Sequence, residues 1–75
     1  MMEKKVNVSG EFIQLNQLLK LEDVVSSGGE AKALIESGKV LVNGEKADAV
    51  RKKLRQGDTV RVGHNVWVIE LTDVR

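Results

Sequence analysis

The sequence predicts an α+β domain in which two short helices pack on one face of a small antiparallel sheet. Apolar residues recur at helical spacing twice in the first half of the chain. Alternating apolar and polar residues, separated by glycine-containing turns, dominate the second half. Because the helices precede a run of strands, the elements do not alternate as they would in a parallel α/β sheet.

The two helices are expected over about residues 15–22 and 28–37. Their apolar stripes are Leu15, Leu18 and Leu19 in the first helix and Ala31, Leu34 and Ile35 in the second. Helices this short, with so little apolar surface, are not stable alone in water. They must therefore pack on each other and on a sheet.

Capping signals flank the second helix. Ser27 and Glu30 have the spacing of a capping box, in which the serine oxygen accepts the Glu30 amide and the glutamate reaches back to the Ser27 amide. Gly38 stands where many helices end in a left-handed residue, a conformation that glycine adopts without steric cost. The second helix should therefore begin after Ser27 and end before Gly38.

Strands are expected on both sides of tight turns. Asn43-Gly44 is a strong hairpin signal, because both residues tolerate the positive φ angles of a type I′ turn. Gly57-Asp58 and Gly63-His64-Asn65 mark two further turns. The expected strands span residues 5–8, 40–42, 45–47, 59–62 and 66–70.

The composition describes one small domain, residues 1–75, with 41% apolar residues and no cysteine. Disulfides and thiolate chemistry are therefore excluded. Apolar runs stay far below the roughly 20 residues that a membrane-spanning helix needs. The first ten residues also lack the apolar core of a signal peptide. We expect a soluble, cytoplasmic, monomeric protein that does not bind membranes.

Positive charge gathers in one segment, although the net charge is only +1. Residues 46–61 contain six basic and two acidic side chains, whereas the remainder carries six basic and nine acidic ones. The densest part comprises Arg51, Lys52, Lys53 and Arg55. Such a run favours a surface that displaces counterions from a nucleic-acid backbone. The alternative interpretation is a solvated, lysine-rich loop.

The start of the second helix is a candidate phosphate site. Ser27, Gly28 and Gly29 would present free amides at the positive end of the helix dipole, and Lys32 could add a charge one turn later. The alternative is a capped helix start with no ligand. With one Phe, one Trp and no Tyr, the chain has few rings on which single-stranded bases could stack, which favours a structured RNA recognised by shape.

No catalytic site, metal site or cofactor is expected. His64 is the single histidine, so no cluster of histidine and cysteine ligands can form. We find neither a nucleophile elbow nor a pair of carboxylates suited to acid–base chemistry. Trp67 is expected at an apolar strand position rather than as a base-stacking platform. The sequence therefore predicts that the protein is not an enzyme.

Residues 15–62 together resemble a known family, the small RNA-binding domain named after ribosomal small-subunit protein four and also called the alpha-L motif. The motif core would cover about residues 12–62. The matching residues are Leu15, Leu18, Leu19, Ser27, Ala31, Ile35, Gly38, Val40, Val42, Asn43, Gly44, Gly57 and Asp58. Residues 18–32 are similar to the short, stand-alone bacterial branch of this family.

The resemblance implies two helices packed on a small, bent antiparallel sheet. It also implies that structured RNA is bound at the start of the second helix and the adjoining hairpin. By position, the implied contacts are Ser27, Gly28, Gly29, Lys32, Lys39, Asn43 and Gly44. Two departures stand out. Many relatives have arginine where this chain has Gly28, and the stand-alone branch tends to carry Glu-Thr-Arg-Arg where this chain has Ala-Asp-Ala-Val at 47–50.

We therefore expect a non-enzymatic, ribosome-associated binder of structured RNA, with ribosomal RNA favoured and transfer RNA as a second candidate. The binding surface would be a cationic notch between the start of the second helix and the hairpin. The alternative is an adaptor that docks on a ribosomal protein or an RNA-modifying enzyme. The wider family suggests a third idea, a subunit that targets a pseudouridine synthase in trans.

Overall fold

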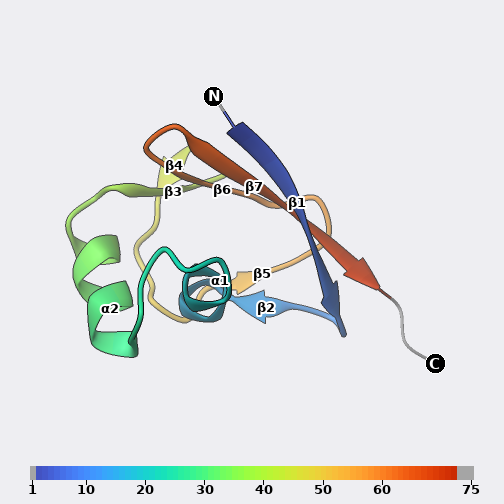
Figure 1. Ribbon diagram of the computed structural model, residues 1–75, viewed down its shortest axis with the longest axis horizontal. Helices are drawn as coiled ribbons and strands as arrows, with labels where there is room; N and C mark the ends of the chain where they lie inside the picture. The colour runs from blue at the N-terminus through green and yellow to red at the C-terminus, as the bar shows by residue number, and fades with distance from the viewer. Residues whose placement is uncertain (1, 73–75) are drawn as a thin grey trace.

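The computed structural model describes residues 2–72, and its two helices and mixed sheet confirm the predicted α+β class (Figure 1). The ends of the expected domain, residues 1 and 73–75, lie outside this range. The elements are β1 (Met2–Ser9), β2 (Ile13–Gln14), α1 (Leu15–Leu21), α2 (Gly28–Glu36), β3 (Val40–Val42), β4 (Glu45–Lys46), β5 (Lys53–Leu54), β6 (Thr59–Val62) and β7 (Asn65–Thr72).

The main sheet has the strand order β1-β7-β6-β3-β4, and β2 pairs with β5 in a separate two-stranded ladder. The strands from β7 to β4 are antiparallel, as expected. The first strand differs from the prediction, because β1 extends over eight residues and runs parallel to β7. Alternation is visible only from Lys5 to Val8, so the sequence pattern alone could not show a pairing with the far end of the chain.

One face of the main sheet is buried beneath the helices. The strand register places Val42, Val60 and Trp67 side by side, and all three are buried. Helix α1 contributes Leu15, Leu18 and Leu19 to the same core, and α2 contributes Ala31 and Ile35. Each fully buried leucine stabilises the fold by about 1.5–3 kcal/mol relative to an exposed one. The stripe of α1 therefore packs as the periodicity predicts, whereas in the stripe of α2 Leu34 is only partly buried.

Trp67 lies at an apolar strand position, as predicted, and its polar atom has a partner. Its indole Nε1 donates a hydrogen bond to Glu22 Oε1 at 3.2 Å, and Lys4 Nζ lies 2.9 Å from the same oxygen. Glu22 follows the last residue of α1 and is mostly buried. This contact joins α1 to both β1 and β7.

The β3–β4 turn adopts the predicted conformation, with φ angles of 52° at Asn43 and 85° at Gly44. The Asn43 side chain also reaches across to β6. Its Oδ1 accepts a hydrogen bond from Thr59 N at 3.0 Å, and its Nδ2 donates to Asp58 Oδ1 at 3.1 Å. Asp58 Oδ2 in turn accepts from Arg55 N at 2.8 Å. The two turns of the sheet therefore hold each other in place.

We expect Asn43→Ala to lower the free energy of unfolding by about 2 kcal/mol, since alanine loses both hydrogen bonds and disfavours the positive φ. Asn43→Gly keeps the backbone freedom and should lower it by only about 1 kcal/mol. Urea unfolding measures both values. Asn7→Ala, an exposed change on β1, is the control and should stay within about 0.5 kcal/mol of the unchanged chain. Equal losses in the two Asn43 variants would contradict a contribution from backbone conformation.

Candidate nucleic-acid interface

Helix α2 begins directly after Ser27, as predicted, but its cap differs in one contact. Ser27 Oγ accepts a hydrogen bond from Glu30 N at 3.2 Å, which confirms half of the capping box. The Glu30 carboxylate does not return to the Ser27 amide. Its Oε1 instead accepts from Ser26 N at 2.7 Å and from Ser26 Oγ at 2.8 Å. Ser26 is preferred because it offers two donors to one oxygen.

The candidate phosphate site at the start of α2 is exposed. Among residues 2–72, no acceptor is found for the N–H groups of Gly28 and Gly29, and Lys32 is exposed one turn later. A Cβ added at Gly28 would meet no atom within 4 Å. The Glu30 carboxylate lies in the same first turn, however, and its negative charge opposes an incoming anion. The N–H groups of Gly28 and Gly29 are thus accessible to an anion, but the negative charge of Glu30 lies in the same turn.

Two lysines gather at the other end of α2. Lys39 follows the helix and is exposed. The Lys46 side chain lies beside Gly38, where a Cβ would be 3.6 Å from Lys46 Cδ, and Gly38 has the predicted positive φ of 81°. Cations are favoured near a helix C-terminus, where the dipole is negative. Lys46 is absent from the residues that sequence reasoning selected as contacts, although its membership of the basic segment was a usable signal.

The hairpin residues have structural explanations of their own. The Asn43 amide is engaged with β6 and the turn before it, and Gly44 supports a positive φ. Helix α2 starts at the end distant from the sheet and finishes beside β3 (Figure 1). The structure therefore does not bring the start of α2 and the β3–β4 turn together in the expected cationic notch. A role of Asn43 and Gly44 in RNA contact stays a prediction.

The basic run of Arg51 and Lys52 is anchored to α1 through its backbone. Leu15 N donates to Lys52 O at 2.8 Å, and Asn16 N donates to Val50 O at 3.1 Å. These bonds satisfy donors that an isolated helix leaves free in its first turn. Val50 is partly buried against the core, whereas Arg51 and Lys52 are exposed. The loop is thus fixed along its main chain while its cations face solvent.

The other two cations of the run gather over an aromatic ring. Lys53 Nζ lies 4.8 Å and Arg55 Cζ 6.0 Å from the centroid of the half-buried Phe12 ring. The short ladder of β2 with β5 creates this cluster, because it pairs Ile13 with Leu54 next to Phe12. No role at the RNA-binding surface was predicted for Phe12. A pairing between two-residue strands leaves no periodic signal by which the cluster could have been found.

None of the candidate cations is neutralised by an ion pair within residues 2–72. The two ion pairs there are Lys4–Glu22 and Lys5–Glu70, and both involve β1. We call the unpaired cations of residues 32–55 the basic surface. Its members are Lys32, Lys39, Lys46, Arg51, Lys52, Lys53 and Arg55, all of them exposed. These cations are therefore available to an anionic ligand.

The described part of the chain contains no group of three acidic, histidine or cysteine side chains placed to hold a metal ion. Within the same residues, no charged or polar residue is fully buried. Neither helix has the length and apolarity needed to cross a bilayer. His64 is exposed in the turn between β6 and β7.

The hydrogen bonds from Ser26 should affect the titration of the Glu30 carboxylate. Hydrogen bonds from the Ser26 N–H and then from its hydroxyl hold the pKa of Glu30 below its ordinary value. Because the folded pKa lies below the unfolded one, this contribution to stability is complete above the unfolded pKa and is lost as the pH falls through the folded pKa. Ser26→Ala removes one donor and should raise the pKa of Glu30 toward its ordinary value.

Carbon-detected NMR titration of Glu30 measures this pKa in both proteins. Urea unfolding over the acidic range should show that Ser26→Ala loses less stability on acidification than the unchanged chain. An unaltered Glu30 pKa in Ser26→Ala would contradict the assignment of the hydroxyl bond.

Comparison with known proteins identifies the family to which the chain belongs. A family model described as the S4 domain matches residues 6–70. A Bacillus subtilis (strain 168) protein named "Probable ribosome maturation protein RlbA" is 41% identical over 61 residues, which cover 81% of this chain and 86% of the relative. An Escherichia coli (strain K12) protein named "Putative RNA-binding protein YbcJ" is 41% identical over 58 residues, covering 76% and 83%. No solved structure matches. The chain belongs to the S4 domain family.

Proposed function

We propose that this protein binds structured RNA through the basic surface, without enzymatic activity. The observation that carries the proposal is a set of seven exposed cations that form no ion pair within residues 2–72. Membership of the S4 domain family and the RNA-binding name of the Escherichia coli relative support it. Cations that are not already paired can replace condensed counterions at phosphate groups without first breaking a protein contact.

The mode of recognition is shape and phosphate position rather than stacking on single-stranded bases. Trp67 is buried, and the half-buried Phe12 ring is already approached by two cations. The main chain at Val50 and Lys52 is held to α1, so Arg51 does not need to be ordered by folding of its loop. A fixed backbone lowers the entropy lost on binding. Such a surface suits the regular phosphate spacing of a structured RNA.

Ribosomal RNA or a ribosomal particle is the target class that we favour over transfer RNA. The name of the Bacillus subtilis relative, which refers to ribosome maturation, supports this choice. Its similarity covers most of both chains, so the relative has little room for a second domain that would bind RNA in its place.

Affinity should depend strongly on salt. If about four phosphates are contacted, log affinity plotted against log salt should have a slope of roughly −3 to −4. Arg51→Glu combined with Lys52→Glu should weaken binding roughly 100-fold and flatten the slope by about 1.5, because two contacts become repulsive. Filter binding or fluorescence anisotropy with ribosomal RNA fragments measures both quantities. Lys5→Glu with Lys20→Glu changes the charge equally outside the basic surface and is the matched control.

Equal weakening in the two double variants would show that net charge, not this surface, governs binding. A flat salt dependence in the unchanged chain would contradict the phosphate-contact mechanism altogether.

Gly28→Arg should strengthen RNA binding. The site accepts a side chain, because a Cβ there meets no atom within 4 Å and the backbone φ is not positive. One added phosphate contact should raise affinity roughly three- to tenfold and steepen the salt slope by about 0.8. Stability should change by less than about 1 kcal/mol, since the gain from replacing glycine is offset by a cation near the positive end of the helix. An equal gain in Asn7→Arg, the charge-matched control on β1, would contradict a contact at this position.

A further inference from the structure

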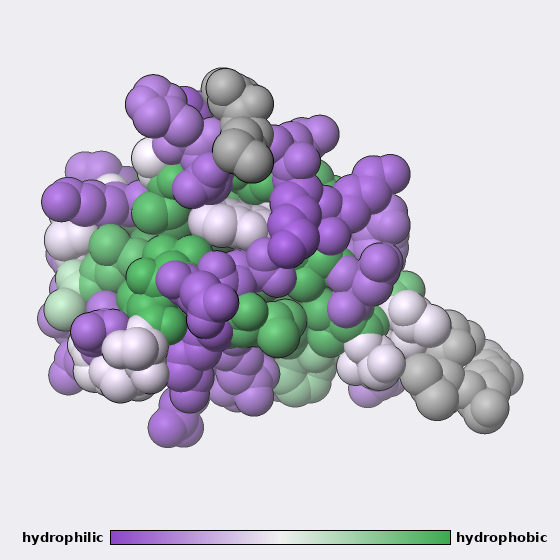
Figure 2. All heavy atoms as spheres, in the orientation of Figure 1, coloured by the Kyte–Doolittle hydropathy of each residue, from purple (hydrophilic) through white to green (hydrophobic). Residues whose placement is uncertain are grey.

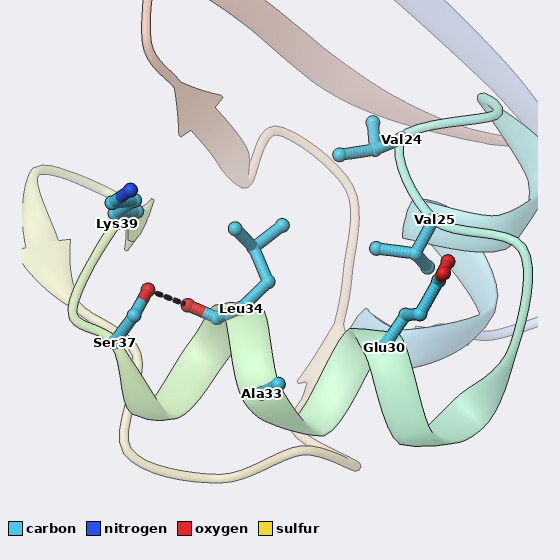
Figure 3. Close-up of a pocket in the computed structure, with 7 residues that line it drawn as sticks. All are labelled: Val24, Val25, Glu30, Ala33, Leu34, Ser37 and Lys39. Carbon is cyan, nitrogen blue, oxygen red and sulfur yellow. Dashed lines mark hydrogen bonds between the residues drawn. The ribbon is translucent and has the colours of Figure 1, made fainter.

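An open groove of about 470 Å³ runs along one side of α2, between the helix and the segment that connects it to α1 (Figure 3). Its walls are apolar. Val24 and Val25 face Leu34 across the groove, and Ala33 lies on the exposed helix side. Figure 2 shows apolar side chains reaching the surface in the region of α2 and its neighbours. The groove shares only Lys39 with the basic surface, and its walls are apolar rather than cationic.

Helical geometry separates the groove from Lys32. The groove residues Glu30, Ala33, Leu34 and Ser37 recur three and four positions apart and therefore share one side of α2. Lys32 does not belong to that series. The buried stripe of Ala31 and Ile35 lies between the two sides. Helix α2 thus presents a cation on one side and an apolar groove on the other.

The two ends of the groove carry opposite charges. Glu30 lies at one end and Lys39 at the other (Figure 3). Ser26 fixes Glu30 Oε1, while Oε2 has no partner among residues 2–72. Lys39 forms no ion pair within the same residues. The Ser37 hydroxyl donates to Leu34 O at 2.6 Å, so it offers the groove no free proton. The charged groups of the groove that can pair with a ligand therefore lie at its two ends.

We propose that this groove binds an amphipathic helical segment of a protein partner. The segment would place leucine-like side chains between the two valines and Leu34, a basic residue at Glu30 and an acidic residue at Lys39. A helix can carry these side chains on one side, with the two charges seven residues and about 10.5 Å apart along its axis. RNA is disfavoured, because the Glu30 carboxylate repels phosphate and the apolar walls lack rings for base stacking.

The proposal goes beyond RNA binding and does not depend on it. With the two ligands on different sides of α2, a protein segment and an RNA could be held at the same time. The domain would then join a structured RNA to a second protein through one helix.

A designed peptide tests the groove directly. The probe is a 12-residue, capped, alanine-rich helix with Lys at position i, Leu at i+3 and i+4, and Glu at i+7. NMR titration of the full chain, without RNA, should shift the Val24, Val25 and Leu34 methyl signals. Replacing both leucines by serine should weaken binding roughly tenfold or more. Probes with Lys or Glu at both ends should each bind roughly two- to fivefold more weakly, because one end then meets a like charge.

Ala33→Arg supplies the matching change in the protein. Ala33 is exposed and outside the core, so a large side chain there fills the groove without removing a packed residue. It should weaken probe binding roughly tenfold, whereas Gln17→Arg, an exposed change on α1, should not. Equal binding of the leucine and serine probes would overturn the proposal. So would ribosomal RNA fragments shifting the same methyl signals while the probe does not.

Discussion

The placement of positive charge in this protein depends on how helix α1 begins. Its first N–H groups, at Leu15 and Asn16, bond to carbonyl oxygens of Lys52 and Val50. The first N–H groups of a helix have no acceptor within the helix, and the carbonyl groups of a loop outside any sheet also need hydrogen-bond partners. The loop therefore supplies acceptors to α1, and α1 supplies donors to the loop. The same two hydrogen bonds that complete the helix hold the main chain on both sides of Arg51 in one position.

Charge is distributed by a consistent rule over the described residues. Acids that carry structural roles are engaged: Glu22 holds Trp67 and Lys4, Asp58 holds the Asn43 amide, and Glu30 is held by Ser26. The cations of the basic surface are left unpaired. Exposed ion pairs contribute little to stability, so leaving these cations free costs the fold little. The arrangement keeps them available for phosphate groups, in accord with membership of the S4 domain family.

Helix α2 divides the molecule into two chemically different surfaces. Its buried stripe packs in the core formed with α1 and the sheet, and the two other sides of the helix lie on either side of that stripe. One side carries the exposed Lys32, and the other borders the apolar groove. A nine-residue helix is long enough to separate the charges at the groove ends and short enough to need both neighbours for stability. The two proposed ligands would therefore share only Lys39.

The sequence by itself determined the features that local physics controls. The spacing of apolar residues specified both helices, Ser27 specified the start of α2, and Asn43-Gly44 specified the hairpin, because each signal acts over a few neighbouring residues. Only the tertiary structure decided that β1 runs parallel to β7, that β5 pairs with β2 beside Phe12, and that the start of α2 and the β3–β4 turn do not share a notch. These features join segments far apart in the chain, and their energies arise only once the core has brought those segments together.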